Sequence, residues 1–125
     1  MSPRAIRDDV ARAYDAVSDA SGVRPVWYRP PHGALSLEGK RAARKVGMKA
    51  VLWTTWGRDW RAEATPESVC REVLEGYLDG GTVLLHDSDC TSDPGAWRSA
   101  LDALPLLAEE LHRRGLTVGP VGQHS

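Results

Sequence analysis

The sequence predicts an α/β fold with parallel strands, because segments of helical pattern alternate with short β-prone segments along the whole chain. Glycine follows the helical segments, as at Gly22, Gly47 and Gly115, where it can end a helix. The β-prone segments are mostly apolar, which is typical of strands covered on both faces. Parallel strands that are joined by helices connect through right-handed crossovers.

The first helix is expected near the N-terminus and ends before Gly22. Its apolar residues recur at helical spacing, at Ile6, Val10, Ala13, Tyr14 and Val17. A short strand is then expected at residues 25–28. Pro30 and Pro31 stop it, because proline has no backbone N–H to donate to a sheet.

The second helix is expected from the N-cap Ser36 to about Val46, with Gly47 as its terminator. Residues 49–54 follow as a buried strand.

The third helix begins with Thr65 as N-cap and Pro66 in the first turn, and Gly80 and Gly81 close it. Its expected apolar face is formed by Val69, Val73, Leu74, Tyr77 and Leu78. Residues 82–85 are an apolar run typical of a fully buried parallel strand.

The fourth helix is expected to start at Asp93 and Pro94 and to be kinked or restarted at Pro105. Its expected apolar residues are Trp97, Leu101, Leu104, Leu107 and Leu111. Gly115 then precedes a last strand at about residues 116–121.

The composition fits one small domain or a piece of a larger one, at 125 residues with 42% hydrophobic residues. Sixteen basic and 17 acidic residues interleave to a net charge of -1, so neither nucleic acid nor an anionic membrane is expected as a partner. No apolar run approaches the ~20 residues of a membrane span. The first residues lead into a charged helix and not into a signal peptide.

The two cysteines, Cys70 and Cys90, are too few for a disulfide framework and match no metal motif. Two free thiols and a single Cys70–Cys90 bridge both stay open.

Three polar segments each follow a β-prone segment: Arg29–Gly33, Asp59–Arg61 and Leu84–Asp87. Ligands of parallel α/β folds bind beyond the carboxyl ends of the strands, so these segments are expected to share one site. A histidine, a carboxylate, a guanidinium and a stiff loop can together hydrolyse an acyl group. Each segment also has an ordinary explanation as a rigid loop, a loop cap or a strand end.

The ordered motifs Arg-x-Pro-His-Gly, Asp-Trp-Arg and Leu-Leu-His-Asp resemble the third to fifth motifs of the polysaccharide deacetylase family, which has the nodulation-type homology domain. The resemblance runs from about Ile6 to Val121. It implies the C-terminal portion of a distorted (β/α) barrel whose first strands are missing here. The implied activity is removal of acetyl groups from a polysaccharide, with peptidoglycan or a chitin-like N-acetylglucosamine polymer as the leading substrates.

The resemblance also implies a role for each motif residue. His86 would be the general acid for the leaving amine, Asp59 would pair with it, and Arg29 would hold the family's aspartate base. The loop formed by Pro31, His32 and Gly33 would contact the substrate, with the backbone N–H of His32 beside the oxyanion. Trp60 and Leu84 would line a small apolar pocket for the acetyl methyl.

The chain departs from the family pattern in three ways. Trp56 stands where the family often has aspartate, and His32 where it often has tyrosine. The family's first two motifs, which supply the catalytic base and the ligands of a divalent metal, with zinc as the leading candidate, have no counterpart here. No metal is therefore expected to bind this chain alone, and the chain alone is expected to be inactive.

Three explanations of these missing motifs stay open: a fragment of a longer enzyme, a non-catalytic carbohydrate-binding or interaction remnant of the family, and a half-barrel that pairs with another chain. The expected partner is an acetylated polysaccharide or oligosaccharide. An unpaired sheet edge is also expected to favour association. The family often acts outside the cytoplasm, but these residues indicate no compartment.

Overall fold

The computed structural model describes residues 1–123, which form two compact units, residues 1–52 and the residues from Trp53 onward. Within the described residues, each unit holds two α-helices, one short 3-10 helix and one two-stranded parallel sheet. The predicted α/β class with parallel strands is therefore confirmed. The closed barrel implied by the family resemblance stays a prediction.

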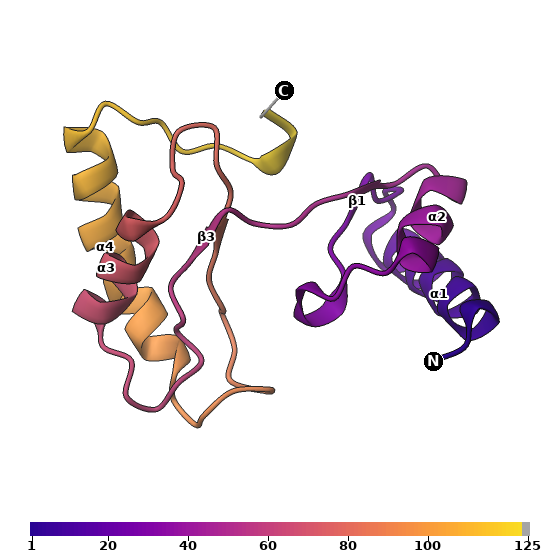
Figure 1. Cartoon of the computed structure of the whole chain (residues 1–125), viewed down its shortest axis with the longest axis horizontal. Coiled ribbons are helices and arrows are strands. Elements are labelled where there is room, and N and C mark those ends of the chain that lie inside the picture. The colour runs from indigo at the N-terminus through magenta and orange to yellow at the C-terminus, as the bar shows by residue number, and fades with distance from the viewer. Residues whose placement is uncertain (124–125) are drawn as a thin grey trace. The chain divides into compact units, whose positions relative to one another are not determined.

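In the first unit, helix α1 (Pro3–Ser21) packs on helix α2 (Leu37–Lys45), as Figure 1 shows. The hydroxyl of Ser36 accepts a hydrogen bond from the Gly39 N–H at 2.9 Å and so caps α2 as predicted. Gly22 ends α1 in the left-handed conformation, at φ 72°. The core between the helices consists of Val10, Ala42, Ala43 and Met48.

The sheet of the first unit consists of β1 (Trp27–Tyr28) and β2 (Lys49–Ala50). The predicted strand at residues 49–54 is wrong in length, because only its first two residues form a strand and the next strand begins beyond it, at Thr55. Lys49–Ala50 pairs with β1, whereas β3 (Thr55–Trp56) begins a separate sheet in the second unit.

In the second unit, β3 pairs in parallel with β4 (Val83–Leu84), and Trp56 lies opposite Leu84 in the register. Helix α3 (Pro66–Glu75) packs on helix α4 (Trp97–Arg113). Their core consists of Ala64, Val69, Val73, Ala103 and Leu107. The predicted full burial of residues 82–85 is wrong, since Val83 is 39% exposed and the described residues supply only one partner strand.

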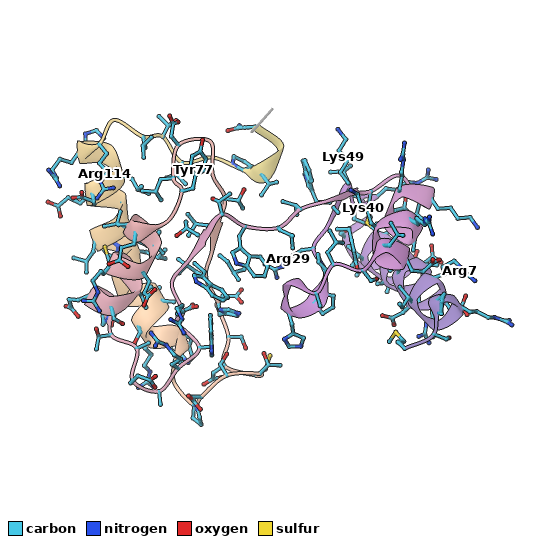
Figure 2. The ribbon with its side chains drawn as sticks, viewed as in Figure 1. Arg7, Arg29, Lys40, Lys49, Tyr77 and Arg114 are labelled. Atoms are coloured by element: carbon cyan, nitrogen blue, oxygen red, sulfur yellow. The ribbon has the colours of Figure 1, made fainter. Side chains whose placement is uncertain are left out.

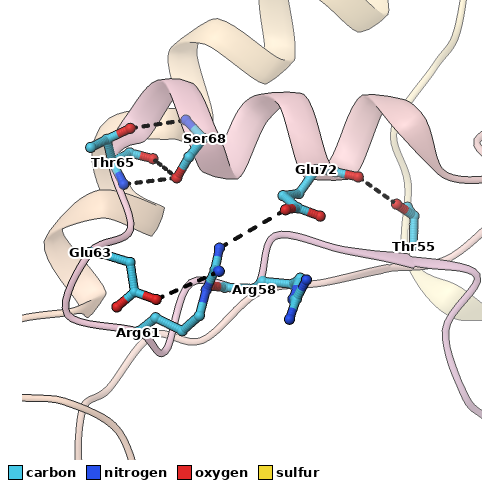
Figure 3. Close-up of polar contacts among 7 residues, drawn as sticks. All are labelled: Thr55, Arg58, Arg61, Glu63, Thr65, Ser68 and Glu72. Atoms are coloured by element: carbon cyan, nitrogen blue, oxygen red, sulfur yellow. Dashed lines mark hydrogen bonds and ion pairs between the residues drawn. The ribbon is translucent and has the colours of Figure 1, made fainter.

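Helix α3 begins as predicted, with a capping box between Thr65 and Ser68 (Figure 3). It ends earlier than predicted, at Glu75, where Gly76 turns to an extended conformation. Tyr77 is consequently exposed, although the sequence places it on the apolar face.

Helix α4 begins later than predicted, because Asp93 is engaged elsewhere. Its carboxylate accepts a hydrogen bond from the Ala62 N–H at 2.7 Å, and its own N–H donates to the Trp60 carbonyl at 3.1 Å. The helix runs through Pro105 without a restart. Its buried face is Ala100, Ala103 and Leu107, so the predicted core residues Leu101 and Leu104 are wrong: they are 54% and 48% exposed.

Gly115 ends α4 as predicted, at φ 72°, and the N–H of Leu116 closes the end on the Leu111 carbonyl at 2.9 Å. The predicted strand at 116–121 is wrong, because the described part of this segment has no partner strand and leads into the 3-10 helix Val121–Gln123. Cys70 and Cys90 are both free thiols.

Candidate active site

Asp59 is the most deeply buried charged residue of the candidate site, at 1% exposure. It lies in the loop that follows β3, and both of its carboxylate oxygens contact His86, which follows β4. Oδ2 accepts a hydrogen bond from the His86 backbone N–H at 2.6 Å, and Oδ1 lies 2.9 Å from the His86 ring atom Nδ1. Asp59 therefore positions both the backbone and the ring of His86.

This contact determines which proton His86 can give or take. An ionised carboxylate only accepts hydrogen bonds, so the Nδ1 of His86 carries the proton that faces Asp59. The other ring nitrogen, Nε2, is left to exchange a proton with a ligand. The His86 side chain is 35% exposed, so the ring is within reach of solvent. A histidine oriented by a buried carboxylate has the geometry to act as a general acid or base.

Arg58 places Asp59 at the cost of backbone strain. It adopts φ 49°, a left-handed value that residues other than glycine rarely take. Such strain concentrates where the chain must aim a functional side chain, and Asp59 is the next residue.

Arg61 of the Asp-Trp-Arg motif contacts its own loop and helix α3. Its Nε donates to the Arg58 carbonyl at 3.1 Å, and its guanidinium lies 3.7 Å from a Glu63 oxygen and 4.0 Å from a Glu72 oxygen (Figure 3). Glu72 belongs to α3, so Arg61 links the Asp59 loop to that helix.

Three tryptophans extend from His86 along the β3 segment. The Trp60 ring lies edge-on to His86, with 5.8 Å between centroids. Trp56 follows at 5.0 Å from Trp60, and Trp53 lies stacked on Trp56 at 6.2 Å. We call Trp53, Trp56 and Trp60 the tryptophan row.

Leu84, which the sequence assigns to an acetyl pocket with Trp60, lies opposite Trp56 in the sheet register. A cavity of about 360 Å³ adjoins His86, but neither Leu84 nor Trp60 lines it. Its walls are instead formed by Leu85, His86, Asp87, Trp97, Ala100, Leu101 and Leu104.

The Arg29–Gly33 segment belongs to the first unit, and its meeting with Asp59 and His86 stays a prediction. Pro31, His32 and Gly33 form a single 3-10 turn, in which His32 is exposed at φ 55°. The exposed Arg29 is labelled in Figure 2 and borders a cavity of about 310 Å³ within that unit.

Comparison with known proteins finds a family model and relatives that are named as polysaccharide deacetylases. The model of the family described as polysaccharide deacetylase matches residues 1–51. The peptidoglycan-N-acetylglucosamine deacetylase PgdA of Listeria monocytogenes is 31% identical over 87 residues, which are 70% of this chain and 18% of that protein. The chain belongs to the polysaccharide deacetylase family.

A second relative within the deacetylase family is the chitooligosaccharide deacetylase of Azorhizobium caulinodans. It is 29% identical over 100 residues, 75% of this chain and 47% of the relative. The chain thus spans less than half the length of either relative.

The fold of this deacetylase-family chain matches that of a solved structure, a CE4 family pseudoenzyme from Bacillus anthracis. The TM-score is 0.85 at 23% identity, over 99% of this chain and 41% of the other. At this sequence identity, the match supports the fold of the chain and does not assign it a function.

Residues 1–123 do not assemble a site for the divalent metal that the family resemblance implies. Among residues 1–123, no three His, Cys, Asp or Glu side chains gather in a group that holds a metal ion. The reactive group that the second unit does assemble is the Asp59–His86 pair. None of the helices in the described part of the chain has the length and apolar character needed to span a membrane.

Sequence reasoning missed Trp53 and the strained Arg58, and it treated Trp56 only as a departure from the family. The signal for the tryptophan row was present, since three of the five tryptophans fall within eight residues. Nothing in the sequence marks Arg58, because its left-handed backbone follows from how the loop closes between β3 and Asp59.

Proposed function

We propose that the protein takes part in removing acetyl groups from an N-acetylglucosamine polymer such as peptidoglycan or a chitin-like chain. The observation that carries this proposal is the buried Asp59 bound to both the backbone and the ring of His86. Two family relatives named as deacetylases of peptidoglycan N-acetylglucosamine and of chitooligosaccharides support the choice of substrate.

In this proposal His86 delivers the proton that the reaction needs at the leaving nitrogen. Amide hydrolysis adds water to the carbonyl carbon and breaks the C–N bond, and the departing amine must gain a proton as it leaves. The Nε2 atom of protonated His86 supplies that proton, while Asp59 stabilises the positive charge that the ring carries beforehand. Trp60 and Leu84 contact the acetyl methyl.

The residues of the first unit have supporting roles in the same proposal. The His32 N–H, held by the turn between Pro31 and Gly33, donates to the oxyanion. Arg29 holds the catalytic base of the family. That base and the metal ligands are not among the 125 residues, so activity is expected only from a protein that includes them.

The test begins with the DNA upstream of the Met1 codon in the same reading frame. An open frame that encodes paired aspartates and then two histidines allows the longer protein to be assayed for acetate release from an N-acetylglucosamine hexamer with added zinc. The proposal requires that release, and His86→Ala should lower it at least about 100-fold, the lower range for a general acid. Unchanged release in His86→Ala would reject the role of His86.

A second candidate function is carbohydrate binding without catalysis, which the tryptophan row beside His86 favours. An in-frame stop upstream, together with saccharide binding and no acetate release at any zinc concentration, would make this the function of the chain.

A further inference from the structure

The loop that follows β3 carries Asp59 and Trp60 of the candidate site, and a residue far along the chain binds this loop at two points. The N–H of Asp93 donates to the Trp60 carbonyl at 3.1 Å, and the Asp93 carboxylate accepts a hydrogen bond from the Ala62 N–H at 2.7 Å. The two points lie on either side of Arg61. Asp93 therefore fixes the backbone at Trp60, the residue next to Asp59.

The Asp93 carboxylate does not serve the helix that follows it. Aspartate before proline is a common start of a helix, and Asp93-Pro94 has this pattern. Helix α4 nevertheless begins at Trp97, and its N-cap is Ala96, whose side chain has no polar atom to cap it. The carboxylate bonds to Ala62 instead. Its contribution is therefore to the placement of the distant loop and not to the start of α4.

A second hydrogen bond from the same part of the chain holds the far end of the loop. The hydroxyl of Ser99, in α4, donates to the Ala64 carbonyl at 2.7 Å. On the side of α3, the guanidinium of Arg61 lies 4.0 Å from a Glu72 oxygen, which is a much longer contact (Figure 3). Residues 93–99 therefore hold the loop by shorter contacts than Glu72 does.

The loops that follow β3 and β4 are joined at two places. At the first, Asp59 binds the backbone N–H and the ring of His86. At the second, Asp93 binds Trp60 and Ala62. Trp60 lies between the two, with its carbonyl on Asp93 and its ring edge-on to His86 at 5.8 Å. A shift of the loop at Asp93 would therefore move both Asp59 and Trp60 relative to His86.

We propose that Asp93, with Ser99 at the far end of the loop, is a positioning residue for His86. By fixing the backbone around Trp60, it keeps the Asp59 carboxylate against the ring and the backbone N–H of His86. A displacement of about 1 Å at a reacting group can cost about 100-fold in rate, so a contact remote from the chemistry can matter. The catalytic meaning of this placement rests on the proposed function, whereas the placement itself does not.

The experiment is 15N NMR of the full chain, which reads the tautomer of the His86 ring and the exchange rate of the His86 backbone N–H. Asp93→Ala should add the Nε2–H tautomer to the Nδ1–H tautomer. It should also speed exchange of that N–H at least about fivefold, the effect of losing one ordinary hydrogen bond. Asp93→Asn keeps an oxygen that can accept from the Ala62 N–H, and it should retain both properties of the unchanged chain.

Asp102→Ala is the matched control, because it removes an exposed carboxylate of α4 outside residues 93–99. It should leave the tautomer and the exchange rate of His86 unchanged. The N–H of Leu107, a buried core residue of α4, is the reference for global unfolding, and its exchange should not change in Asp93→Ala. Ser99→Ala replaces Asp93→Ala where the latter does not fold, and the same result is required of it.

Failure of this inference is distinguishable from failure of the proposed function. An unchanged tautomer and exchange rate of His86 in Asp93→Ala would overturn the positioning role, even where the longer protein releases acetate. An equal rise in exchange at Leu107, or the same losses in Asp93→Asn, would also overturn it. A change confined to His86 that Asp93→Asn does not show supports the role, even where no acetate is released.

Discussion

At the residue scale, the hydrogen bonds of Asp59 decide how His86 is held. Asp59→Asn keeps one oxygen, which faces the His86 backbone N–H because that group can only donate, and so places its NH2 group against the ring Nδ1. We expect it to destabilise the protein by about 1–3 kcal/mol, the range for a buried polar group left unsatisfied. Denaturant unfolding measures the loss in free energy of unfolding. In 15N NMR, the His86 ring should show the neutral Nδ1–H tautomer only while Asp59 is present.

Asp87→Asn is the control for this change, because it removes a carboxylate from the residue next to His86 that is exposed. It should leave both the stability and the tautomer unchanged. A tautomer that is the same in Asp59→Asn would show that the contact does not orient the ring.

The two thiols should differ in reactivity. Burial raises the pKa of Cys70 above that of an ordinary thiol, and the negative charge of Glu110 raises it further, against a smaller opposing effect of Arg114. Only the thiolate reacts, and a raised pKa means that a smaller fraction of Cys70 is thiolate at any pH below that pKa. Cys90 is exposed. At pH 8 iodoacetamide should therefore modify Cys90 before Cys70. Mass spectrometry follows the two reactions, and the variants Cys70→Ser and Cys90→Ser assign each modified site. Equal rates of modification at the two cysteines would contradict the prediction.

At the residue scale, the sequence predicts contacts between residues of recognised motifs. It misses contacts that depend on how the strands and loops pack together. The pairing of Asp59 with His86 is implied by the resemblance of the motifs to the family, and the structure contains that contact. The strain at Arg58 and the stacking of Trp53 on Trp56 arise only when β3 is placed, so no local pattern reveals them.

At the scale of elements, Gly76 allows α3 to lie close to β3. A Cβ at this position would overlap the side chain of Thr55, whose hydroxyl is bonded to the Val73 carbonyl at the end of α3. Gly76→Ala should therefore destabilise the protein by about 1–3 kcal/mol through overpacking, even though alanine is the better helix former. Glu75→Ala, one residue earlier and exposed, should change stability little, and equal effects in urea unfolding would count against the close approach.

The helix boundaries set by local chemistry are predicted well, and the strand boundaries are not. Ser36, Thr65 and Gly22 act within one turn of their own helices, so the sequence alone identifies them. A strand needs a partner that lies far away in sequence. Lys49–Ala50 and Thr55–Trp56 accordingly separate, because each pairs with a different strand.

At the scale of the whole molecule, several large apolar side chains of both units are exposed to water. Large exposed apolar residues include Val26, Val83, Leu101, Leu104 and Val118. Each described sheet has only two strands, and two-stranded sheets are marginal and present unpaired edges. Both features favour association of the isolated chain with itself or with a covering segment.

We therefore expect the isolated chain to associate as its concentration rises, with sedimentation velocity showing a growing share of species larger than the monomer. The double variant Leu101→Glu and Leu104→Glu should shift this toward the monomer, because it places charge on the exposed side of α4 without touching the buried Ala103 and Leu107. Lys45→Glu alters charge at an exposed position and removes no apolar side chain, so it should leave association nearly unchanged. A concentration-independent monomer in the unchanged chain would show that its exposed apolar surface is tolerated in water.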